Sequence, residues 1–454
     1  MAVPERTLGA LKLHMRESLI ARTLQLPVQE FIHTQGVSSA FLLIAAVAAL
    51  VWANSPWRDA YHHAWHIQIT LSGLSLPAHA WINDAMMALF FFLVGMEIKR
   101  EIVHGELSDL RRAALPVIAG LGGMVAPALL YLMFNFGRAS SHGWGVPMAT
   151  DIAFSLGVLA LIPRVPPELK VFLLSLAIAD DIGAITVIAV FYTQRLHSEY
   201  LLLALALIGV ILVCRKVGVS RPILYTALGF GVWFCVLRSG VHATIAGVVL
   251  GFLVPVRSRV SLDAFRDLGA VTMEEFREAQ AAGDTARANR VLGALEYLVW
   301  QTESPADRVT RKLHDWIAFL VLPLFALANA GVSFSAGTWN LLLHSPVTWG
   351  VAIGLFFGKP LGILTACWLT VKLGIARLPN SVTWRQIAGV AVLAGIGFTV
   401  SLFIAGLAFP DQAHLDAAKA AVLLTSLFAG MAGYLFLRSA MSAVPSPPET
   451  QPKG

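Results

Sequence analysis

The sequence predicts an all-α polytopic membrane protein with about twelve transmembrane helices. Of its 454 residues, 57% are hydrophobic and 13% are charged, whereas soluble domains carry about 25% charged residues. Its mean hydropathy is +0.71. Apolar stretches long enough to cross a bilayer lie near residues 37–54, 81–98, 113–136, 145–162, 171–192, 201–214, 222–237, 240–256, 316–337, 346–371, 386–409 and 418–437. Lipid offers the backbone no hydrogen bonds, so these stretches are expected to be helices rather than open strands.

The basic residues predict how the chain crosses the membrane. The net charge of +6 would suggest a nucleic-acid partner in a soluble protein. Here the excess follows the rule that cytoplasmic loops are basic, so no nucleic acid is expected. Nine Lys and Arg residues lie at 257–312, after the eighth stretch, and none lies at 338–345, after the ninth. This pattern, with an even number of spans, places both termini in the cytoplasm.

One membrane domain is expected at residues 33–438. Residues 1–32 are basic and amphipathic, which is typical of a cytoplasmic segment on the inner membrane surface. Residues 439–454 are rich in Pro and Ser and are expected to form a disordered cytoplasmic tail. The loop at 257–312 is the largest cytoplasmic one, and its stretch at 273–299 favours a surface helix.

The first extracytoplasmic loop predicts a small β-hairpin. Polar and apolar residues alternate from His66 to Leu71 and again from Leu74 to Leu76, and Ser72-Gly73 between them is typical of a turn. An isolated hairpin is marginally stable in water. We therefore expect it to pair with a second copy of the chain or to pack on the membrane domain.

Four charged residues lie deep inside the apolar stretches: Asp151, Asp180, Asp181 and Lys359. Each charge at the bilayer centre costs about 2.5–3.5 kcal/mol. Counting from the nearest cytoplasmic loop at 1.5 Å per residue places Asp151, Asp180 and Lys359 about 18–20 Å deep. These residues are therefore expected to share one level near the bilayer midplane, although they belong to three different helices.

A single buried acid can be a structural hydrogen-bonding group, but three acids and a lysine at one depth favour a cation site. Carboxylates are hard oxygen ligands suited to small cations. Their transfer from water into the protein interior disfavours their charged form. A carboxyl group that holds a proton cannot also hold Na⁺, and this competition is the physical basis of exchange. Neighbouring helix residues point about 100° apart. One of Asp180 and Asp181 is therefore expected to face the ion and the other to face Lys359.

Two stretches are expected to be broken helices. Residues 143–150 contain two glycines and a proline before Asp151, and Gly395 and Gly397 precede Thr399 at about the same depth. Glycine weakens a helix by about 1 kcal/mol, although glycines also permit close helix packing. Broken ends would present partial charges to the site, with Asp151 balancing positive ends and Lys359 negative ones.

Eight short motifs carry a family resemblance. They are WANSPW at 52–57, WIND at 81–84, VGMEIKRE at 94–101, ATDIAF at 149–154, IADDIGAI at 178–185, SGVHAT at 239–244, GKPLG at 358–362 and GIGFT at 395–399. Their identity and order resemble those of the NhaA-type sodium/proton antiporters of bacterial inner membranes over about residues 35–437.

The resemblance implies an inverted repeat, with helices 3–5 repeated as helices 10–12, and broken helices 4 and 11 that cross. It implies an electrogenic antiporter that exports Na⁺ or Li⁺ and imports H⁺, with a role in pH regulation and salt tolerance. No cofactor is expected beyond the transported ions. The extracytoplasmic hairpin at 65–76 would build a homodimer, and membrane lipid would surround the spans.

The resemblance also assigns residues. Asp181 would be the principal carrier of cation and proton, Asp180 would contribute to the cation site and pair with Lys359, and Asp151 and Thr150 would support the site. The broken-helix support would come from Gly395, Gly397 and Thr399. The pH response would come from Glu97, Arg100, Glu101 and His242, although the first three could equally be an ordinary ion network at a helix end and the last a hydrogen-bonded histidine at a helix start.

One departure leaves the pH threshold open: Arg311 and Lys312 stand where the family often carries an acid. Two other classes remain to be weighed. An intramembrane aspartyl protease also needs two aspartates, but its motifs differ from Ala149-Thr150-Asp151, and Lys359 would have no role in it. A cation channel would place a ring of acids along a pore, whereas single acids on three helices suggest an occluding site.

Overall fold

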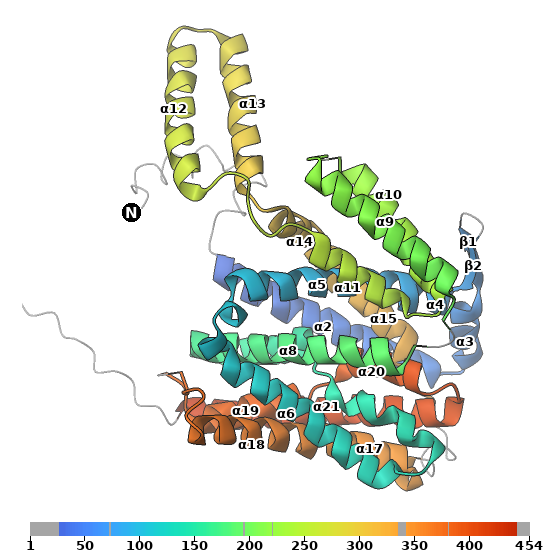
Figure 1. Ribbon diagram of the computed structural model, residues 1–454. Coiled ribbons are helices and arrows are strands. Elements are labelled where there is room, and N and C mark those ends of the chain that lie inside the picture. Colours follow the sequence, from blue (N-terminus) through green and yellow to red (C-terminus); the bar gives the residue numbers. More distant parts are fainter. Residues whose placement is uncertain are drawn as a thin grey trace, which may run out of the picture.

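The computed structural model describes residues 27–71, 74–193, 196–219, 221–334, 342–379 and 381–442 (Figure 1). Within them, ten helical segments are long and apolar enough to cross a membrane. An eleventh is the pair α19 (Trp384–Ala394) and α20 (Phe398–Ala408), bent by 44°. The apolar helix α11 (Ala243–Leu253) lies in the eighth of the predicted stretches, and its 11 residues fall short of the length of a membrane-spanning helix. Each of the twelve predicted stretches is therefore largely helical, and the all-α class is confirmed.

The remaining spanning segments run in chain order. They are α2 (Pro27–Ala53); α4 (Ala78–Ala80), η2 (Trp81–Met86) and α5 (Met87–His104); α6 (Leu110–Asn135); η4 (Ala139–Met148) and α7 (Ile152–Ala160); α8 (Pro167–Phe191); α9 (Ser198–Lys216); α10 (Pro222–Ser239); α14 (Pro305–Trp316), η5 (Ile317–Val321) and α15 (Leu322–Asn329); α17 (Pro346–Ile353), η6 (Gly354–Gly358) and α18 (Lys359–Lys372); and α21 (Gln412–Ser442). The domain boundaries predicted at 33 and 438 thus fall inside α2 and α21. Residues 1–26 and 443–454 lie outside the described chain.

The ninth span begins earlier than the hydropathy pattern predicts. Helix α14 starts at Pro305, because the Ser304 hydroxyl accepts a hydrogen bond from the Asp307 N–H (3.1 Å) and proline suits the first helical position. The span ends at Asn329 rather than near 337. The loop predicted to be cytoplasmic therefore ends at Ser304, not at 312. Charged residues in α14 hid this first part of the helix from a pattern based on hydropathy.

The loop predicted to be cytoplasmic forms a helical hairpin rather than one surface helix. Helices α12 (Leu262–Ala281) and α13 (Thr285–Thr302) pack on each other and project from the membrane domain (Figure 1). The turn between them contains Gly283 with φ of 68°, a left-handed conformation that suits glycine.

The predicted β-hairpin is present. Strands β1 (Gln68–Leu71) and β2 (Leu74–Pro77) are antiparallel, and Gln68 pairs with Pro77. The predicted start at His66 is wrong, because His66 ends the helix α3 (Arg58–His66), which the alternation did not reveal. The predicted turn, Ser72-Gly73, lies outside the described residues.

Small residues bring pairs of helices into backbone contact. A Cβ atom on Gly122 of α6 would meet the carbonyl oxygen of Gly362 of α18, and one on Gly362 would meet that of Gly122. Such close approach is typical of helix packing in membranes. It holds α18, which begins at Lys359, directly against α6.

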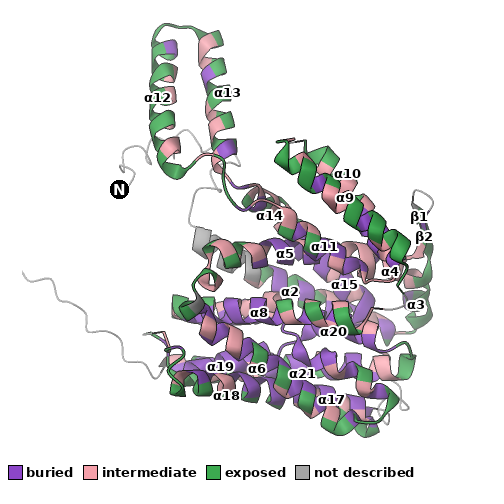
Figure 2. Ribbon diagram, in the orientation of Figure 1, coloured by how far each residue is buried: buried purple, intermediate pink, exposed green. Residues whose placement is uncertain are grey.

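Helix α8 lies at the centre of the domain. In the most apolar 18-residue stretch of α8, 67% of the residues are buried, whereas in that of α9 only 11% are buried. Figure 2 shows the same contrast, with buried residues along α8, α19 and α20 and exposed ones on α9, α10 and the α12–α13 hairpin. The two acids of α8 are therefore surrounded by protein.

Candidate functional site

The fourth and eleventh spans are both interrupted, and the interruptions touch. Residues Ala149–Asp151 are extended between η4 and α7, and Gly395–Gly397 separate α19 from α20. The Asp151 N–H donates a hydrogen bond to the Ile396 carbonyl (2.7 Å). Both predicted breaks are therefore confirmed. The first half of the fourth span differs from expectation, because η4 is a 3₁₀ helix.

Asp151 lies where two helices begin. Its Oδ1 accepts from the N–H of Phe154 in α7 (2.9 Å), and its Oδ2 accepts from the N–H (3.0 Å) and hydroxyl (2.5 Å) of Thr399 in α20. The side chain is 2% exposed. The carboxylate thus faces the positive ends of both half-helices, as the sequence predicts.

Lys359 lies at the negative end of η4. Its Nζ donates to the carbonyl of Met148, the last residue of η4, and lies 2.9 Å from Asp180 Oδ2. Neither side chain of this ion pair is exposed. Among the described residues, Asp180 Oδ1 has no hydrogen-bond partner. The expected pairing of Lys359 with Asp180 is therefore present in this conformation.

Thr150 links this ion pair to the eleventh span. Its hydroxyl oxygen lies 2.7 Å from Asp180 Oδ2 and 3.0 Å from the carbonyl oxygen of Ala394, the last residue of α19. A hydroxyl carries one proton, while an ionised carboxylate and a carbonyl only accept. The Thr150 hydroxyl can therefore donate a hydrogen bond to only one of these two oxygens at a time, unless Asp180 is itself protonated.

Asp181 points into a small cavity instead of toward Lys359. It is 3% exposed and makes no hydrogen bond or ion pair within the described residues. The cavity has a volume of about 70 Å³, room for an ion or a few water molecules. Its other polar lining residues are Ser38, Glu97, Thr150, Asp151, His314 and Thr399. The described chain has no group of three His, Cys, Asp or Glu side chains placed to hold a metal ion.

The residues proposed for a pH response lie in two places, with Glu97, Arg100 and Glu101 within one turn of α5 and His242 before α11. Glu97 lines the same cavity as Asp181. Arg100 lies 3.5 Å from Asp307 of α14, and Glu101 accepts a hydrogen bond from the Glu106 N–H (2.8 Å). His242 precedes α11 and packs edge-on against Phe403 of α20, 5.4 Å between ring centres. In the described chain, no hydrogen bond or ion pair joins any two of the four.

The sequence did not reveal the hydroxyl groups that satisfy the broken backbones. The Ser155 hydroxyl donates to the Leu393 carbonyl (3.1 Å), and the Ser401 hydroxyl donates to the Val146 carbonyl (2.8 Å). The Ser426 hydroxyl accepts from the N–H of Phe398 (3.1 Å). Serine soon after a helix break was the available signal in the first two cases.

Buried carboxylates where two broken helices cross are typical of ion-coupled secondary transporters, of which NhaA-type antiporters are a known example. The fold and the site together define this class. The family model for "Na+/H+ antiporter 1" matches residues 29–437, and the chain belongs to this family.

Three relatives are similar over nearly their whole length. The Na⁺/H⁺ antiporter NhaA of Koribacter versatilis is 44% identical over 428 residues, covering 93% of each chain. That of Oleidesulfovibrio alaskensis is 45% identical over 91% of this chain and 93% of its own. The antiporter NhaA 2 of Sorangium cellulosum is 47% identical over 93% and 92%, respectively. These proteins exchange Na⁺ and H⁺ and are transporters, which supports neither the protease nor the channel alternative.

Proposed function

We propose that this chain exports Na⁺ or Li⁺ from the cytoplasm in exchange for imported protons, with Asp181 as the carrier. The observation that supports this assignment is the buried carboxylate of Asp181 in the cavity, which has no hydrogen bond or ion pair in the part of the chain that the structure describes. A carboxylate without protein donors has both oxygens available for a cation or a proton. The hydroxyls of Thr150 and Thr399 and the carboxyl groups of Glu97 and Asp151 offer further oxygen atoms nearby.

Competition between Na⁺ and a proton for one carboxylate explains ion exchange, and a second group that binds a proton would explain net charge movement across the membrane. One Na⁺ exchanged for one proton moves no net charge, so an electrogenic cycle needs a further proton per Na⁺. The Asp180–Lys359 pair is the candidate, because it lies in contact with Thr150 at the wall of the same cavity. Neighbouring acids that interact strongly titrate as a unit, so the cycle belongs to the whole cluster.

The crossing would move as the site changes from one side of the membrane to the other. Four half-helix ends meet there, and each is balanced by Asp151, Lys359 or Thr150. A cation or proton on Asp181 changes the charge among these ends. The rearrangement would shift the half-helices relative to each other and open the cavity to the opposite side.

We place the chain in the bacterial inner membrane with both termini in the cytoplasm, on the strength of its basic loops. We also propose a homodimer formed through the β-hairpin, whose first strand is exposed at residues 68–70 on this chain. Its role would be sodium and pH homeostasis.

The test is cation-dependent dissipation of ΔpH in inverted membrane vesicles, with Na⁺, Li⁺ and K⁺ compared across pH. Asp181→Asn should abolish the response to Na⁺ and Li⁺. Asp84→Asn is a matched control, because Asp84 also lies within a span but does not line the cavity. Full ΔpH dissipation by Asp181→Asn would contradict the carrier assignment. An unchanged electrogenic current in Lys359→Ala would contradict the role of the ion pair.

A further inference from the structure

A second cleft, of about 350 Å³, lies where the third span ends, the fourth begins and the fifth ends. Figure 1 shows the corresponding ends of α6 and α8 on the same side of the molecule as β1 and β2. Its volume is within the range of small-ligand sites, about 300–1,000 Å³. None of its described lining residues also lines the Asp181 cavity. The cleft is therefore a separate site.

The cleft opens at the edge of the lipid-facing surface. Its wall consists of apolar side chains from three spans: Leu132, Phe136, Trp144 and Phe191. Phe136 is 83% exposed and Phe191 is 59% exposed. At a rise of 1.5 Å per residue, Phe191 lies about 16 Å beyond Asp180 along α8, and half of the hydrocarbon core is about 15 Å thick. With Asp180 at the midplane, the cleft lies at the boundary between acyl chains and headgroups.

The rim of the cleft is polar and aromatic. The Tyr192 hydroxyl donates a hydrogen bond to the carbonyl of His142 (2.6 Å), which joins the end of α8 to η4. Trp144 packs edge-on against Phe191, with 5.1 Å between ring centres. Tyr and Trp favour the membrane–water interface, because one end of each side chain is apolar and the other is polar. The rim thus also places the mouth of the cleft at the level of the headgroups.

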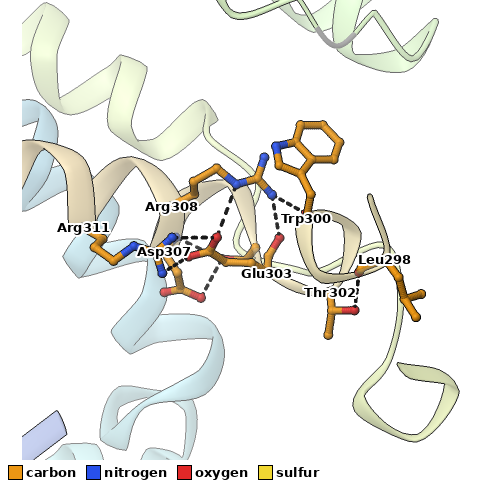
Figure 3. Close-up of polar contacts among 8 residues, drawn as sticks. Leu298, Trp300, Thr302, Glu303, Asp307, Arg308 and Arg311 are labelled. Atoms are coloured by element: carbon orange, nitrogen blue, oxygen red, sulfur yellow. Dashed lines mark hydrogen bonds and ion pairs between the residues drawn. The ribbon is translucent and has the colours of Figure 1, made fainter. Parts of the chain in front are cut away.

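Arg138 lies beside this mouth without an acidic partner. It follows Gly137, one of the lining residues, and its side chain is exposed. Among the described residues, its guanidinium makes no ion pair or hydrogen bond. Arginines of the ninth span are paired instead: Figure 3 shows Arg308 and Arg311 beside Glu303, at 3.4 and 2.7 Å. Arg138 is therefore available to an anion from outside the chain.

The surroundings of Arg138 would not repel an anion. No Asp or Glu occurs in the neighbouring stretches of the chain, at residues 129–150, 182–198 and 330–358. Helices α20 and α21 also pack on η4. The first acid after α20 is Asp411, which pairs with His414, and Asp416 in α21 accepts a hydrogen bond from Gln412 (2.8 Å). The mouth of the cleft therefore carries an unpaired positive charge next to an apolar wall.

We propose that a phospholipid from the leaflet on the β-hairpin side binds this cleft, with an acyl chain on the apolar wall and its phosphate at Arg138. Arginine binds phosphate oxygens through two parallel N–H donors, and the acyl chain removes apolar wall from water. Trp144 belongs to η4, the half-helix whose last carbonyl accepts from Lys359. The lipid would thus support the helix crossing from outside. The site is independent of the role proposed for Asp181.

The test is photo-labelling of the full chain in lipid nanodiscs that contain a phosphatidylethanolamine with a diazirine in its acyl chain. Adducts located by peptide mass spectrometry should concentrate on the wall, at Leu132, Trp144 and Phe191. Val213 of α9, which is 61% exposed, reports ordinary contact with lipid. An alkane with a diazirine but no headgroup is the matched probe. It should label the wall several-fold less than the phospholipid does, each relative to Val213.

Variants separate the phosphate contact from the acyl-chain contact. Arg138→Gln should lower labelling of the wall about three- to tenfold, because a charged hydrogen bond is lost. Arg238→Gln is the control, since Arg238 is also an exposed arginine at the end of a span but does not line the cleft. Leu132→Trp and Ser141→Phe each fill the cleft and should remove the adducts from Phe191. An unchanged gel-filtration profile shows that each variant is folded.

Three results would overturn the proposal. The first is equal labelling of the wall by the phospholipid and the alkane, or by the phospholipid in Arg138→Gln and the unchanged protein. The second is wall adducts that persist in both filled variants. The third is labelling of the wall no denser than that of Val213, which would identify an ordinary contact with bulk lipid.

Discussion

Removing the Lys359 ammonium should destabilise the protein, and removing its partner's charge as well should restore most of the loss. Lys359 Nζ lies 2.9 Å from Asp180 Oδ2, and neither side chain is exposed. Breaking a buried ion pair from one side costs about 3–5 kcal/mol, because the remaining charge is buried without compensation. Asp180 Oδ1 already lacks a partner, so Asp180 has little with which to replace the lysine.

Lys359→Met keeps the length of the side chain and removes its charge. With an unfolding entropy of about 2.1 cal/mol/K per residue, the loss of about 3–5 kcal/mol should lower the unfolding temperature by about 3–5 °C. The double variant Lys359→Met with Asp180→Asn removes both charges, and replacing a whole buried pair is often neutral or stabilising.

The assay is thermal unfolding in detergent, followed by tryptophan fluorescence. Lys312→Met is the control, since Lys312 is exposed and should behave as the unchanged protein. An unfolding temperature unchanged in Lys359→Met, or a double variant no more stable than the single one, would refute the reasoning.

Four further predictions follow from the packing, the caps and the hairpin. Gly122→Ala should cost about 1–3 kcal/mol of stability by overpacking α6 on α18. Gly36→Ala is the control, since a Cβ there meets nothing, and it should not destabilise the protein. Equal unfolding temperatures for the two variants would contradict the overpacking. Thr399→Val should cost about 1.5–3 kcal/mol through the lost hydrogen bond to the Asp151 carboxylate, and Thr399→Ser should retain it; equal losses would argue against the hydroxyl. Hydrogen bonds from the His414 side chain and backbone lower the pKa of the exposed Asp411 carboxyl below 3.8. The ionised carboxyl therefore stabilises the fold at a pH above the unfolded-state pKa, and this stabilisation is lost as the pH falls through the folded-state pKa. Asp411→Asn should make the unfolding temperature depend less on pH in this acid range, and an unchanged dependence would exclude Asp411. Replacing residues 68–76 by a Gly-Ser linker should shift dimer toward monomer in detergent, and an unaltered dimer fraction would count against the hairpin interface.

The spans, the breaks and the buried ion cluster could be predicted from the sequence because each has a large energetic signature. A charged residue in lipid and a glycine in a helix are costly, so Asp180, Lys359 and Gly395 stand out among apolar neighbours. Their common depth followed from counting along helices of regular rise, and the ion pair between Lys359 and Asp180 agrees with it.

Other features could not be predicted, because their causes are tertiary or weak. Helix α14 is polar where it leaves the membrane, so hydropathy missed its first turns. The α3 helix has only nine residues, and its helical pattern, with Tyr61 and Trp65 four residues apart, is too short to predict a helix by itself. The division of roles between Asp180 and Asp181 depends on which side of α8 faces Lys359, and the sequence offered only the resemblance for that choice. The serine hydroxyls act through contacts with distant backbone groups, which no local pattern reveals.

The measurement that tests the central claim most directly is proton release when Na⁺ binds to the purified protein. Calorimetric titration in buffers of different ionisation enthalpy would count the protons released per Na⁺ bound. We expect the unchanged protein to release protons as Na⁺ binds and Asp181→Asn to lose both the binding and the release. Na⁺ binding without proton release, or undiminished release from Asp181→Asn, would contradict competition at Asp181.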